Sequence, residues 1–583
     1  MKKIRLIMIA TTLIVSTSSA NVGMKSGEGE ISALEQQHSI DFRKMGLGVL
    51  SVSKEGNIDR YEVEVADPTK ALAWGAREVL PRFAARALEG SRIADDLKGV
   101  KFVVEVDWGR YERGEADSIH LYPPQTAGHG RDTLLAKLAK EHRGIYLTVD
   151  KAHNRFSGRV EPMDFLSASA EKNFLQWKGA GFDCDAGAGP KSCTLNGGRF
   201  SVGSRGGKSP GGLTIEGAGC SYKIDAHLLG RQECHLPAMK LSFVQGAEKS
   251  DFELEKLRLG SEASPDGNMR VNYRVFGELG KFGGKVVETN QTTAFSFKGL
   301  NFSGGTQHLD RSAWEGLAML LEGEKNATAP ANAALWKKRL IHLLSDGNLY
   351  RYRLHLASAE FQVTSPTQTV QGSLKDWEDD YALSLGTFIR YDDNNRIAEI
   401  DFSQHGAQSA LAGKVEGFSL GYGLDRLYNP LPDFVDLVID VATQPGGPSE
   451  KLTPEQERRI QKILTTMVHK GLEAHLAPLS IEKITFSEGG LPSFGPLAFQ
   501  AKAKLKANNV DLNNPMAPMM LLGSFLAHGE LRLKSRDFRT LLPLLPPDLA
   551  KMAQMVAQKE GDTVRFVIRF ENGGLTVNGV PMM

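Results

Sequence analysis

Short runs of alternating apolar and polar residues, separated by turn residues, are the feature that most limits what this chain can fold into. Alternation with a period of two is typical of strands that bury one face. Tight turns between such runs predict hairpins, whose strands are antiparallel. We therefore expect an α+β protein that is predominantly antiparallel β, with long curved meander sheets and short amphipathic helices on one face. The clearest runs are Ile58–Val65, Phe102–Val106, Tyr350–Leu356 and Val564–Phe570, and the predicted turns are Lys54–Asn57, Asp346–Asn348, Asp392–Asn395 and Glu571–Gly574.

Four segments have helical spacing instead. The strongest runs from Thr453 to about Leu476, where Thr453 fits an N-cap, Pro454 the first helical position and Gln456 a capping box. A second is expected over about 548–558, with Leu549, Met552, Met555 and Val556 facing inward. The other two are expected over Leu72–Leu88 and Ala334–Leu344.

A weak unit recurs in which a strand ends in an aspartate and a short apolar helix follows. It appears at Asp67, Asp310, Asp425 and Asp537. An aspartate at this position accepts hydrogen bonds from the free amides of the first helical turn. We interpret these four residues as helix caps and not as catalytic acids.

The N-terminus predicts export. Lys2, Lys3 and Arg5 precede ten uncharged residues, Leu6 to Val15, and small residues at Ser18 and Ala20 suit a cleavage site. This pattern is typical of a secretory signal peptide, and its apolar part is about half the ~20 residues that cross a membrane. Expected localisation is the periplasm, with inner-membrane association if the signal is kept.

The length of 583 residues predicts several packed units. Expected divisions are the signal peptide (1–20), an N-terminal β-rich region (21–250) with a disulfide-bearing segment (180–235), a central β-rich repeat region (251–450) and a C-terminal helix-plus-β region (451–583). Linker-like stretches at Gly203–Gly212, Glu322–Asn332 and Gln444–Ser449 are part of the basis for these divisions.

The four cysteines Cys184, Cys193, Cys220 and Cys234 all lie within one stretch. An even, clustered set in an exported chain predicts disulfides, for which three pairings exist. We favour Cys184–Cys193 and Cys220–Cys234, because the residues after Cys184 resemble a tight hairpin. Closing so short a loop stabilises a fold by roughly 2–3 kcal/mol. A zinc site using Cys234 and His235 is the alternative, but the cysteine spacing that zinc sites favour is missing.

Charge and motifs point away from several function classes. The chain has 70 basic and 69 acidic residues, and loss of the signal leaves 67 against 69, so no basic surface for nucleic acid is expected. The glycine-rich Ser204–Ser209 segment lacks the first glycine of a phosphate-binding loop. His469 and His475 are six residues apart, too far around a helix to share a metal. Asp392–Asn395 lacks the glycine of a calcium loop, and we predict no catalytic residue, metal or cofactor.

Methionines gather near the C-terminus. Methionine adapts to irregular apolar partners, so these residues either fill the core or form an apolar binding surface for acyl chains, a membrane or a protein. The candidate surface comprises Met516, Met519, Met520, Phe525, Met552 and Met555.

Three segments resemble the YdgA/YihF family of Gram-negative envelope proteins, a family of unknown function. They are the C-terminal Val564–Met582 with its Leu575-Thr-Val-Asn-Gly579, the run from Gly529 through Leu541 to the methionine helix, and Leu309–Glu315. The resemblance covers about 160–583 and implies an envelope protein, but it carries no catalytic residues over. The cysteine pairs are not part of the family pattern, and the apolar leader is shorter than the family's usual anchor.

Taken together, the sequence favours a non-catalytic periplasmic binding or scaffolding protein whose partner is a lipid or a membrane surface. One alternative is a structural protein that pairs with another envelope protein through exposed sheet edges. A second is a hydrolase whose site forms only on folding.

Overall fold

The computed structural model places most of the chain in two compact units. The N-terminal unit comprises residues 1–247, 255–260 and 321–323, and the C-terminal unit the remainder. The structure describes residues 46–67, 99–124, 143–150, 152–166, 172–185, 191–206, 210–225, 229–267, 269–314, 330–345, 348–406, 410–442, 453–488, 492–512 and 514–582, with residues 42, 70, 140, 141 and 227. The predicted signal peptide and the predicted helix at 72–88 lie outside these residues.

The N-terminal unit is built on antiparallel strands in the pairing order β1-β2-β3-β4-β5-β6-β9-β10-β13-β14-β12-β11-β8-β7. The long strand β14 pairs with β13 along its first half and with β12 along its second. Helix α5 (Trp108–Glu112) follows β3 and is capped by Asp107. The bounds are β1 Leu47–Glu55, β2 Ile58–Val65, β3 Lys101–Asp107, β4 Ile119–Tyr122, β5 Ile145–Asp150, β6 Arg155–Val160, β7 Met163–Leu166, β8 Asn173–Trp177, β9 Ala180–Asp185, β10 Lys191–Gly197, β11 Phe200–Ser204, β12 Gly211–Glu216, β13 Gly219–Ile224 and β14 Gly230–Gln245.

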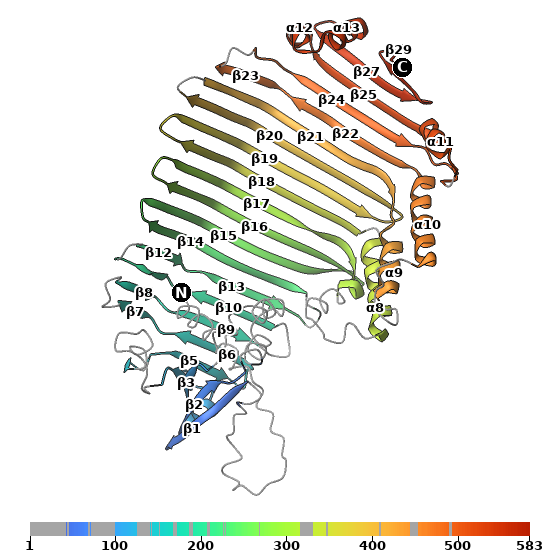
Figure 1. The fold of residues 1–583 in the computed structure, drawn as a ribbon. Coiled ribbons are helices and arrows are strands. Elements are labelled where there is room, and N and C mark those ends of the chain that lie inside the picture. The colour runs from blue at the N-terminus through green and yellow to red at the C-terminus, as the bar shows by residue number, and fades with distance from the viewer. Residues whose placement is uncertain are drawn as a thin grey trace. The chain divides into compact units, whose positions relative to one another are not determined.

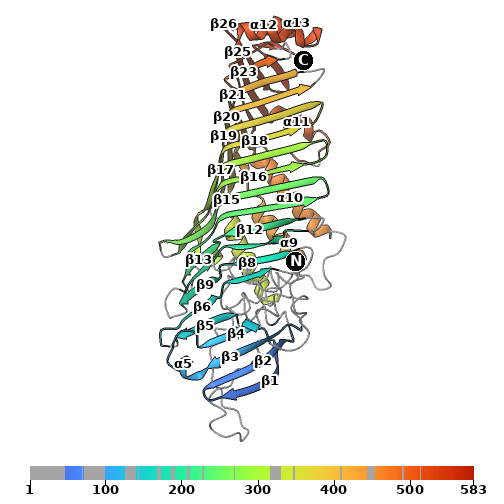
Figure 2. The same cartoon turned by 90° about the vertical axis from the view of Figure 1, so that its left-hand side faces the viewer.

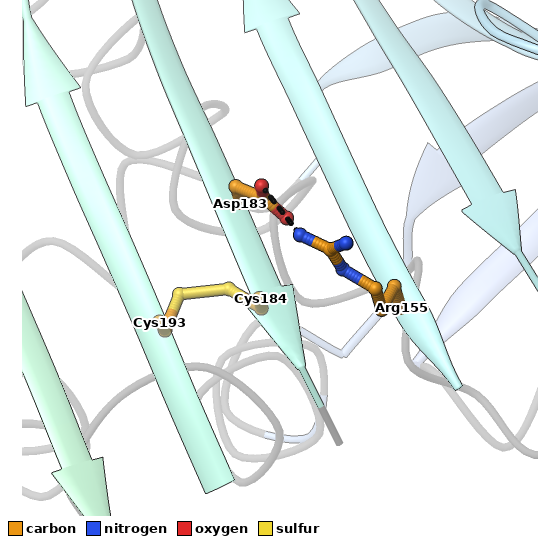
Figure 3. Close-up of a disulfide and its surroundings, with 4 residues drawn as sticks. All are labelled: Arg155, Asp183, Cys184 and Cys193. Atoms are coloured by element: carbon orange, nitrogen blue, oxygen red, sulfur yellow. Dashed lines mark hydrogen bonds and ion pairs between the residues drawn. A yellow bond between two sulfur atoms is a disulfide. The ribbon is translucent and has the colours of Figure 1, made fainter. Parts of the chain in front are cut away.

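Both disulfides join residues that face each other on neighbouring strands of this unit. Cys184 of β9 pairs with Cys193 of β10, and Cys220 of β13 pairs with Cys234 of β14. This is the favoured pairing, so the prediction of disulfides is confirmed and the zinc alternative is wrong. The first bridge belongs to the core, where Cys184 packs with valine, leucine and phenylalanine side chains. Figure 3 shows this bridge beside the ion pair of Arg155 and Asp183, in which Nη2 of the arginine lies 3.1 Å from Oδ2 of the aspartate.

Long antiparallel strands build the C-terminal unit. Strands β16 to β21 follow one another in chain order, as both ribbon views show (Figure 1, Figure 2). Strand β21 then pairs with β22 at one end and β23 at the other, and the order continues β22-β24-β25-β27-β28-β29. The bounds are β15 Glu248–Asp266 (which also contributes to the N-terminal unit), β16 Arg270–Val287, β17 Thr292–Asp310, β18 Asn348–Thr364, β19 Gln368–Leu385, β20 Phe388–Gly406, β21 Ala410–Tyr428, β22 Leu472–Ile481, β23 Lys483–Glu488, β24 Leu497–Leu505, β25 Phe525–Lys534, β26 Gln558–Glu560, β27 Thr563–Glu571, β28 Gly574–Val577 and β29 Val580–Pro581.

A line of unusual residues crosses these long strands, and we call it the kink row. It comprises Gly299, Ala357, Asp376, Ala398 and Gly417. The residues on both sides of these five are paired in register on β17 to β21, which brings the five opposite one another. Gly299, Asp376 and Gly417, on alternate strands, have φ of 66°, 48° and 64°. Such a residue interrupts the up-and-down alternation of a strand and bends it.

The apolar positions change parity at the kink row. On β17, Phe295 and Phe297 precede it at odd positions, whereas Leu300 and Phe302 follow at even positions. On β18 the apolar alternation likewise runs through Ala359 and Phe361 on one side and through Leu354 and Leu356 on the other. We infer that the kink row keeps the apolar side chains of both halves on one side of a bent sheet.

Helices of the C-terminal unit lie at the ends of the strands. Helices α8 (Pro330–Ser345) and α9 (Leu431–Ala442) pack together, α8 contacts β17 and β18, and α10 (Pro454–Lys470) contacts β21. An ion network joins the three helices: Lys337 Nζ lies 2.8 Å from Asp440, and Arg459 bridges Asp436 and Asp440. Towards the C-terminus, α11 (Ala517–Ser524) precedes β25, and α12 (Ser535–Leu541), a 3₁₀ turn (Leu542–Leu544) and α13 (Pro547–Val556) follow it.

The predicted fold class is confirmed at its coarser level, mostly antiparallel sheet with a few helices. The capping box of Thr453 and Gln456 is present as predicted. Asp310 caps the turn after β17, since its carboxylate accepts a hydrogen bond from the Ala313 amide at 3.0 Å. Asp67 accepts a hydrogen bond from the Lys70 amide at 2.9 Å. The turns at 54–57 and 571–574 also connect strands as predicted.

Other local predictions were wrong. The helix that begins at Pro454 ends at Lys470, because Gly471 takes a φ of 77° and β22 starts at Leu472. Asp392–Asn395 is not a turn but the middle of β20. The hairpin predicted around 346–348 is also wrong, because the element that ends at Ser345 is helix α8 and β18 begins at Asn348.

Two of the four aspartates are not caps. Asp425 lies within β21, and Asp537 lies inside α12, where its buried carboxylate accepts from the Gly495 amide at 2.8 Å. On α13 only Val556 is buried, whereas Leu549, Met552 and Met555 are exposed. The Gly203–Gly212 stretch is not a linker either, since β11 and β12 pair across it.

Replacing Cys184 and Cys193 together by alanine is expected to destabilise the N-terminal unit by about 3–4 kcal/mol. Losing the loop constraint accounts for about 2–3 kcal/mol, and losing two buried sulfurs adds to it. The matched pair Cys220/Cys234→Ala should cost only the loop contribution, because Cys234 is exposed. Urea unfolding followed by tryptophan fluorescence measures both, and a larger loss for the second pair would contradict this account.

Gly299→Ala is expected to destabilise the C-terminal unit by about 2–4 kcal/mol. A positive φ costs alanine about 1 kcal/mol, and its Cβ would lie 2.8 Å from the Ala357 Cβ, which cannot move aside. Gly561→Ala is the control, with a φ of 64° and no atom within 4 Å of the added carbon. Thermal or urea unfolding should show the larger loss for Gly299→Ala, and equal losses would mean that the close approach at the kink row is unimportant.

Candidate functional site

An apolar strip runs across the C-terminal unit, perpendicular to its strands. In antiparallel sheets, residues that face each other in register project to the same side. Two adjacent rows of such residues cross ten strands from β17 to β28, a distance of about 43 Å at ~4.8 Å per strand. The rows are Gly304, Tyr352, Tyr381, Asp393, Tyr422, Leu476, Ala501, Gly529, Ile568 and Val577, and Thr306, Tyr350, Leu383, Tyr391, Leu424, Ala474, Ala503, Ala527, Phe570 and Leu575.

Tyrosines dominate the part of the strip on β18 to β21. The rings of Tyr352, Tyr381, Tyr391 and Tyr422 form a chain with successive centroids 5.4, 6.3 and 6.1 Å apart. Tyr422 is 41% exposed. This stretch is therefore a surface of aromatic rings that is partly open to solvent.

The strip is hollowed over β22, β24, β25 and β27. Small side chains form the middle of this hollow, which has a volume of about 380 Å³, within the range of small-molecule sites. Its exposed lining is almost entirely apolar. The lining residues on the strip side are Ala474, Leu476, Phe499, Ala501, Ala503, Ala527, Gly529, Ile568, Phe570 and Leu575.

One carboxylate, that of Asp393, interrupts the apolar strip, and a second, that of Asp379, lies in the row beside it. Asp393 is 8% exposed and accepts from the hydroxyls of Tyr391 and Tyr422, both at 2.7 Å, and from the Asn395 amide at 2.8 Å. Asp379 belongs to the next strand, opposite Asn395. Trp377 donates to Asn395 at 3.3 Å and completes the cluster.

Burial raises the pKa of Asp379, and the adjacent charge of Asp393 raises it further. A protonated Asp379 can donate to Asp393, whereas two ionised carboxylates repel each other. Hydrogen bonding to Asp393 also raises the pKa of Tyr422. The cluster is thus a hydrogen-bonded group centred on Asp393 within the aromatic stretch, with Asp379 beside it.

The opposite side of the same sheet is polar. A hollow of about 820 Å³ lies over a registered row formed by Ser296, Glu360, Ser373, Asp401, Lys414 and Thr485. Lys414 lies 2.6 Å from Glu399, and hydrogen bonds from Lys375 and Lys414 lower the pKa of Glu399 to about 2. Burial raises the pKa of Asp401, and the neighbouring Glu399 adds to this shift. Charges that pair with each other in this way suit a solvated outer face.

The methionines predicted as one binding surface fall into two groups. Met516, Met519 and Met520 belong to α11 and its cap, whereas Met552 and Met555 belong to α13, and the two helices lie at opposite ends of β25 (Figure 1). All five are between 38% and 70% exposed. Phe525 begins β25, and its ring lies 5.7 Å from Phe570 of the hollow.

The two candidate histidines are separated by a change of secondary structure. His469 Nε2, on α10, lies 2.8 Å from the Val510 carbonyl oxygen, and His475, on β22, lies 3.0 Å from Asp425. Within the part of the chain that the structure describes, no group of histidine, cysteine and acidic residues could hold a metal. Sequence reasoning missed Asp379 and the tyrosine chain, because their proximity depends on register between strands.

Comparison with known proteins gave no match: no family model fits the sequence, and no curated protein or solved structure is significantly similar to it. No helix among the described residues is both long and apolar enough to cross a membrane. The two disulfides point to an oxidising compartment outside the cytoplasm.

Asp379→Asn is expected to stabilise the C-terminal unit at neutral pH. An acid whose pKa is raised by folding favours the folded state at low pH and loses that contribution as the pH rises through the shifted value. An asparagine amide can donate to Asp393 at every pH. Urea unfolding at pH 7 should therefore give a higher midpoint for the variant, and the difference should shrink below about pH 4, where both forms are neutral.

Asp376→Asn is the matched control for this experiment, since Asp376 lies on the same strand with its side chain 66% exposed. It should leave the pH dependence of unfolding close to that of the wild type. A loss of stability in Asp379→Asn at all pH values would instead mean that the ionised Asp379 supports the fold.

Proposed function

We propose that this protein is a non-catalytic binding protein of the periplasm that holds an apolar chain, such as the acyl chain of a lipid, along the strip of its C-terminal unit. The observation that carries the proposal is the registered apolar strip with its hollow of about 380 Å³. Burying apolar surface is favourable at roughly 25 cal/mol per Å², so a half-exposed strip gains free energy when an apolar ligand covers it.

Shape supports an elongated ligand over a compact one. The strip is two residues wide, about 7 Å along the strands, and roughly six times longer across them. The hollow deepens one end because Ala501, Ala503 and Ala527 leave space that the tyrosines fill elsewhere. A flexible hydrocarbon chain matches this shape.

The compartment is supported by independent features. The disulfides require oxidising conditions. The N-terminal pattern of Lys2, Lys3 and Arg5 before an apolar run is that of an export signal, and the YdgA/YihF resemblance points to the same envelope. We accordingly place the protein in the periplasm, with inner-membrane association if the signal is retained.

Ala503→Phe is expected to weaken binding of a fluorescent fatty acid by tenfold or more. The added ring would occupy the hollow, where Ala503 faces Ala474 and Ala527. The control is Ala498→Phe, which places the same ring on the other side of the same strand, where it faces Ser480 and Arg532. Titration of the purified protein with the fatty acid measures both.

Equal affinities of Ala503→Phe and the wild type would overturn the proposal, as would wild-type protein that fails to bind the fatty acid. Mass spectrometry of an organic extract of the protein gives a second check. Reproducible absence of lipid from protein purified without detergent counts against an acyl ligand.

A further inference from the structure

The segment around α11 has no charged residue, and few of its side chains are buried. From Leu512 to Ala527 the sequence contains no lysine, arginine, aspartate or glutamate. Of α11, only Ala517 is buried. Met516, Met519, Met520 and Leu522 are 58%, 64%, 50% and 47% exposed. A helix that is apolar on all sides and exposed to water is costly unless something apolar covers it.

This segment continues the apolar strip. Phe525 follows α11 directly and pairs with Leu505 of β24. Its side chain projects to the same side of the sheet as those of Ala503 and Ala527 in the hollow. The ring of Phe525 also lies 5.7 Å from that of Phe570, which lines the hollow. An unbroken apolar path therefore leads from α11 to the hollow.

Lysines flank the segment on the other face of the sheet. Lys502 and Lys504 alternate along the end of β24, and Lys506 follows the strand directly. The Lys506 amide donates a hydrogen bond to the Ser524 carbonyl at the end of α11. Lys504 lies 2.5 Å from Glu473, and Arg569 faces His528 on the neighbouring strands.

We propose that α11 and its flanking residues dock the protein onto a lipid bilayer that contains anionic phospholipid. The apolar side chains of α11 would enter the interface between headgroups and acyl chains, while the lysines contact phosphates. With eight residues, α11 is far too short to span the bilayer, so the docking is peripheral. A second protein fits this surface less well than a bilayer does. An uncharged helix beside a row of lysines matches a lipid surface, where an apolar layer lies beneath anionic headgroups.

Docking in this position gives the strip access to its ligand, a consequence that rests on the proposed function. The path through Phe525 and Phe570 begins at α11. An acyl chain leaving the bilayer would meet apolar side chains along the whole path to the hollow. Binding to the bilayer itself does not depend on this transfer.

Vesicle co-sedimentation of the mature full-length protein tests the docking. We expect binding to vesicles of phosphatidylcholine with phosphatidylglycerol, and weaker binding to phosphatidylcholine alone. Met519→Ser/Met520→Ser should weaken binding by about tenfold or more, since two exposed apolar side chains are lost from the interface. Met552→Ser/Met555→Ser on α13 is the matched control and should leave binding unchanged.

Lys502→Gln/Lys506→Gln should reduce binding only to the anionic vesicles and remove part of its salt dependence. Three results would overturn the proposal: wild-type protein that stays in the supernatant with both vesicles, equal losses in the two methionine pairs, or a change in oligomeric state of Met519→Ser/Met520→Ser by ultracentrifugation without a change in vesicle binding. The last result would assign the segment to contact between protein chains.

Titration with the fluorescent fatty acid in the absence of vesicles separates the two proposals. If Met519→Ser/Met520→Ser keeps fatty-acid binding while no variant or wild type binds vesicles, docking fails and the proposed function stands. If vesicles bind as expected but Ala503→Phe does not affect the fatty acid, the proposed function fails and docking stands.

Discussion

Register between antiparallel strands is the constraint on which the rest of the C-terminal unit depends. Each strand contributes only two residues to the apolar strip, so no strand alone carries a binding surface. Pairing aligns these residues because neighbours in register share a face. A shift of one residue on any central strand would turn its apolar set to the polar side. The strip and the fold are therefore specified by the same interactions.

The kink row solves a problem that long strands create. A strand of 19 residues such as β17 does not remain flat over its whole length, because strands twist. Placing Gly299 and Gly417 in register with Asp376 bends several strands along one line. The change of apolar parity at this line is what such a bend requires if the apolar side chains of both halves are to share one side. Small residues at Ala357 and Ala398 fit the same line, since a large side chain would obstruct the bend.

How far the sequence predicts the structure depends on the range of the interaction. Local signals were sufficient for the alternating strands, the capping box at Thr453 and the paired cysteines, because each involves residues close in the chain. The same local reasoning failed at Asp392–Asn395. Four consecutive polar residues look like a turn, yet Asp393 is buried because Tyr391 and Tyr422 donate to it. Tyr422 lies on another strand, and no pattern around residue 392 announces it.

The methionines show the opposite case, in which residues that are close in the sequence lie apart in the structure. Their clustering near the C-terminus suggested one surface. The groups at 516–520 and 552–555 are instead separated by β25, because α11 precedes this extended strand and α13 follows it. That separation makes the two groups distinguishable in function. Only the first adjoins the apolar strip, through Phe525 and Phe570, whereas α13 packs near a separate small core around Val564 and Phe538.

An apolar strip exposed to water also promotes aggregation, so its polar interruptions need an explanation. A continuous apolar surface on a sheet favours contact between copies of the chain. Asp379 and Asp393 place a carboxylate pair in the middle of the aromatic stretch, where a broad apolar surface would remove the pair from water and so carry a desolvation cost. A thin hydrocarbon chain can pass beside the pair while the tyrosine hydroxyls continue to satisfy Asp393. The cluster thus costs a broad protein contact more than it costs a narrow ligand, which is the discrimination that the proposed binding of an acyl chain requires.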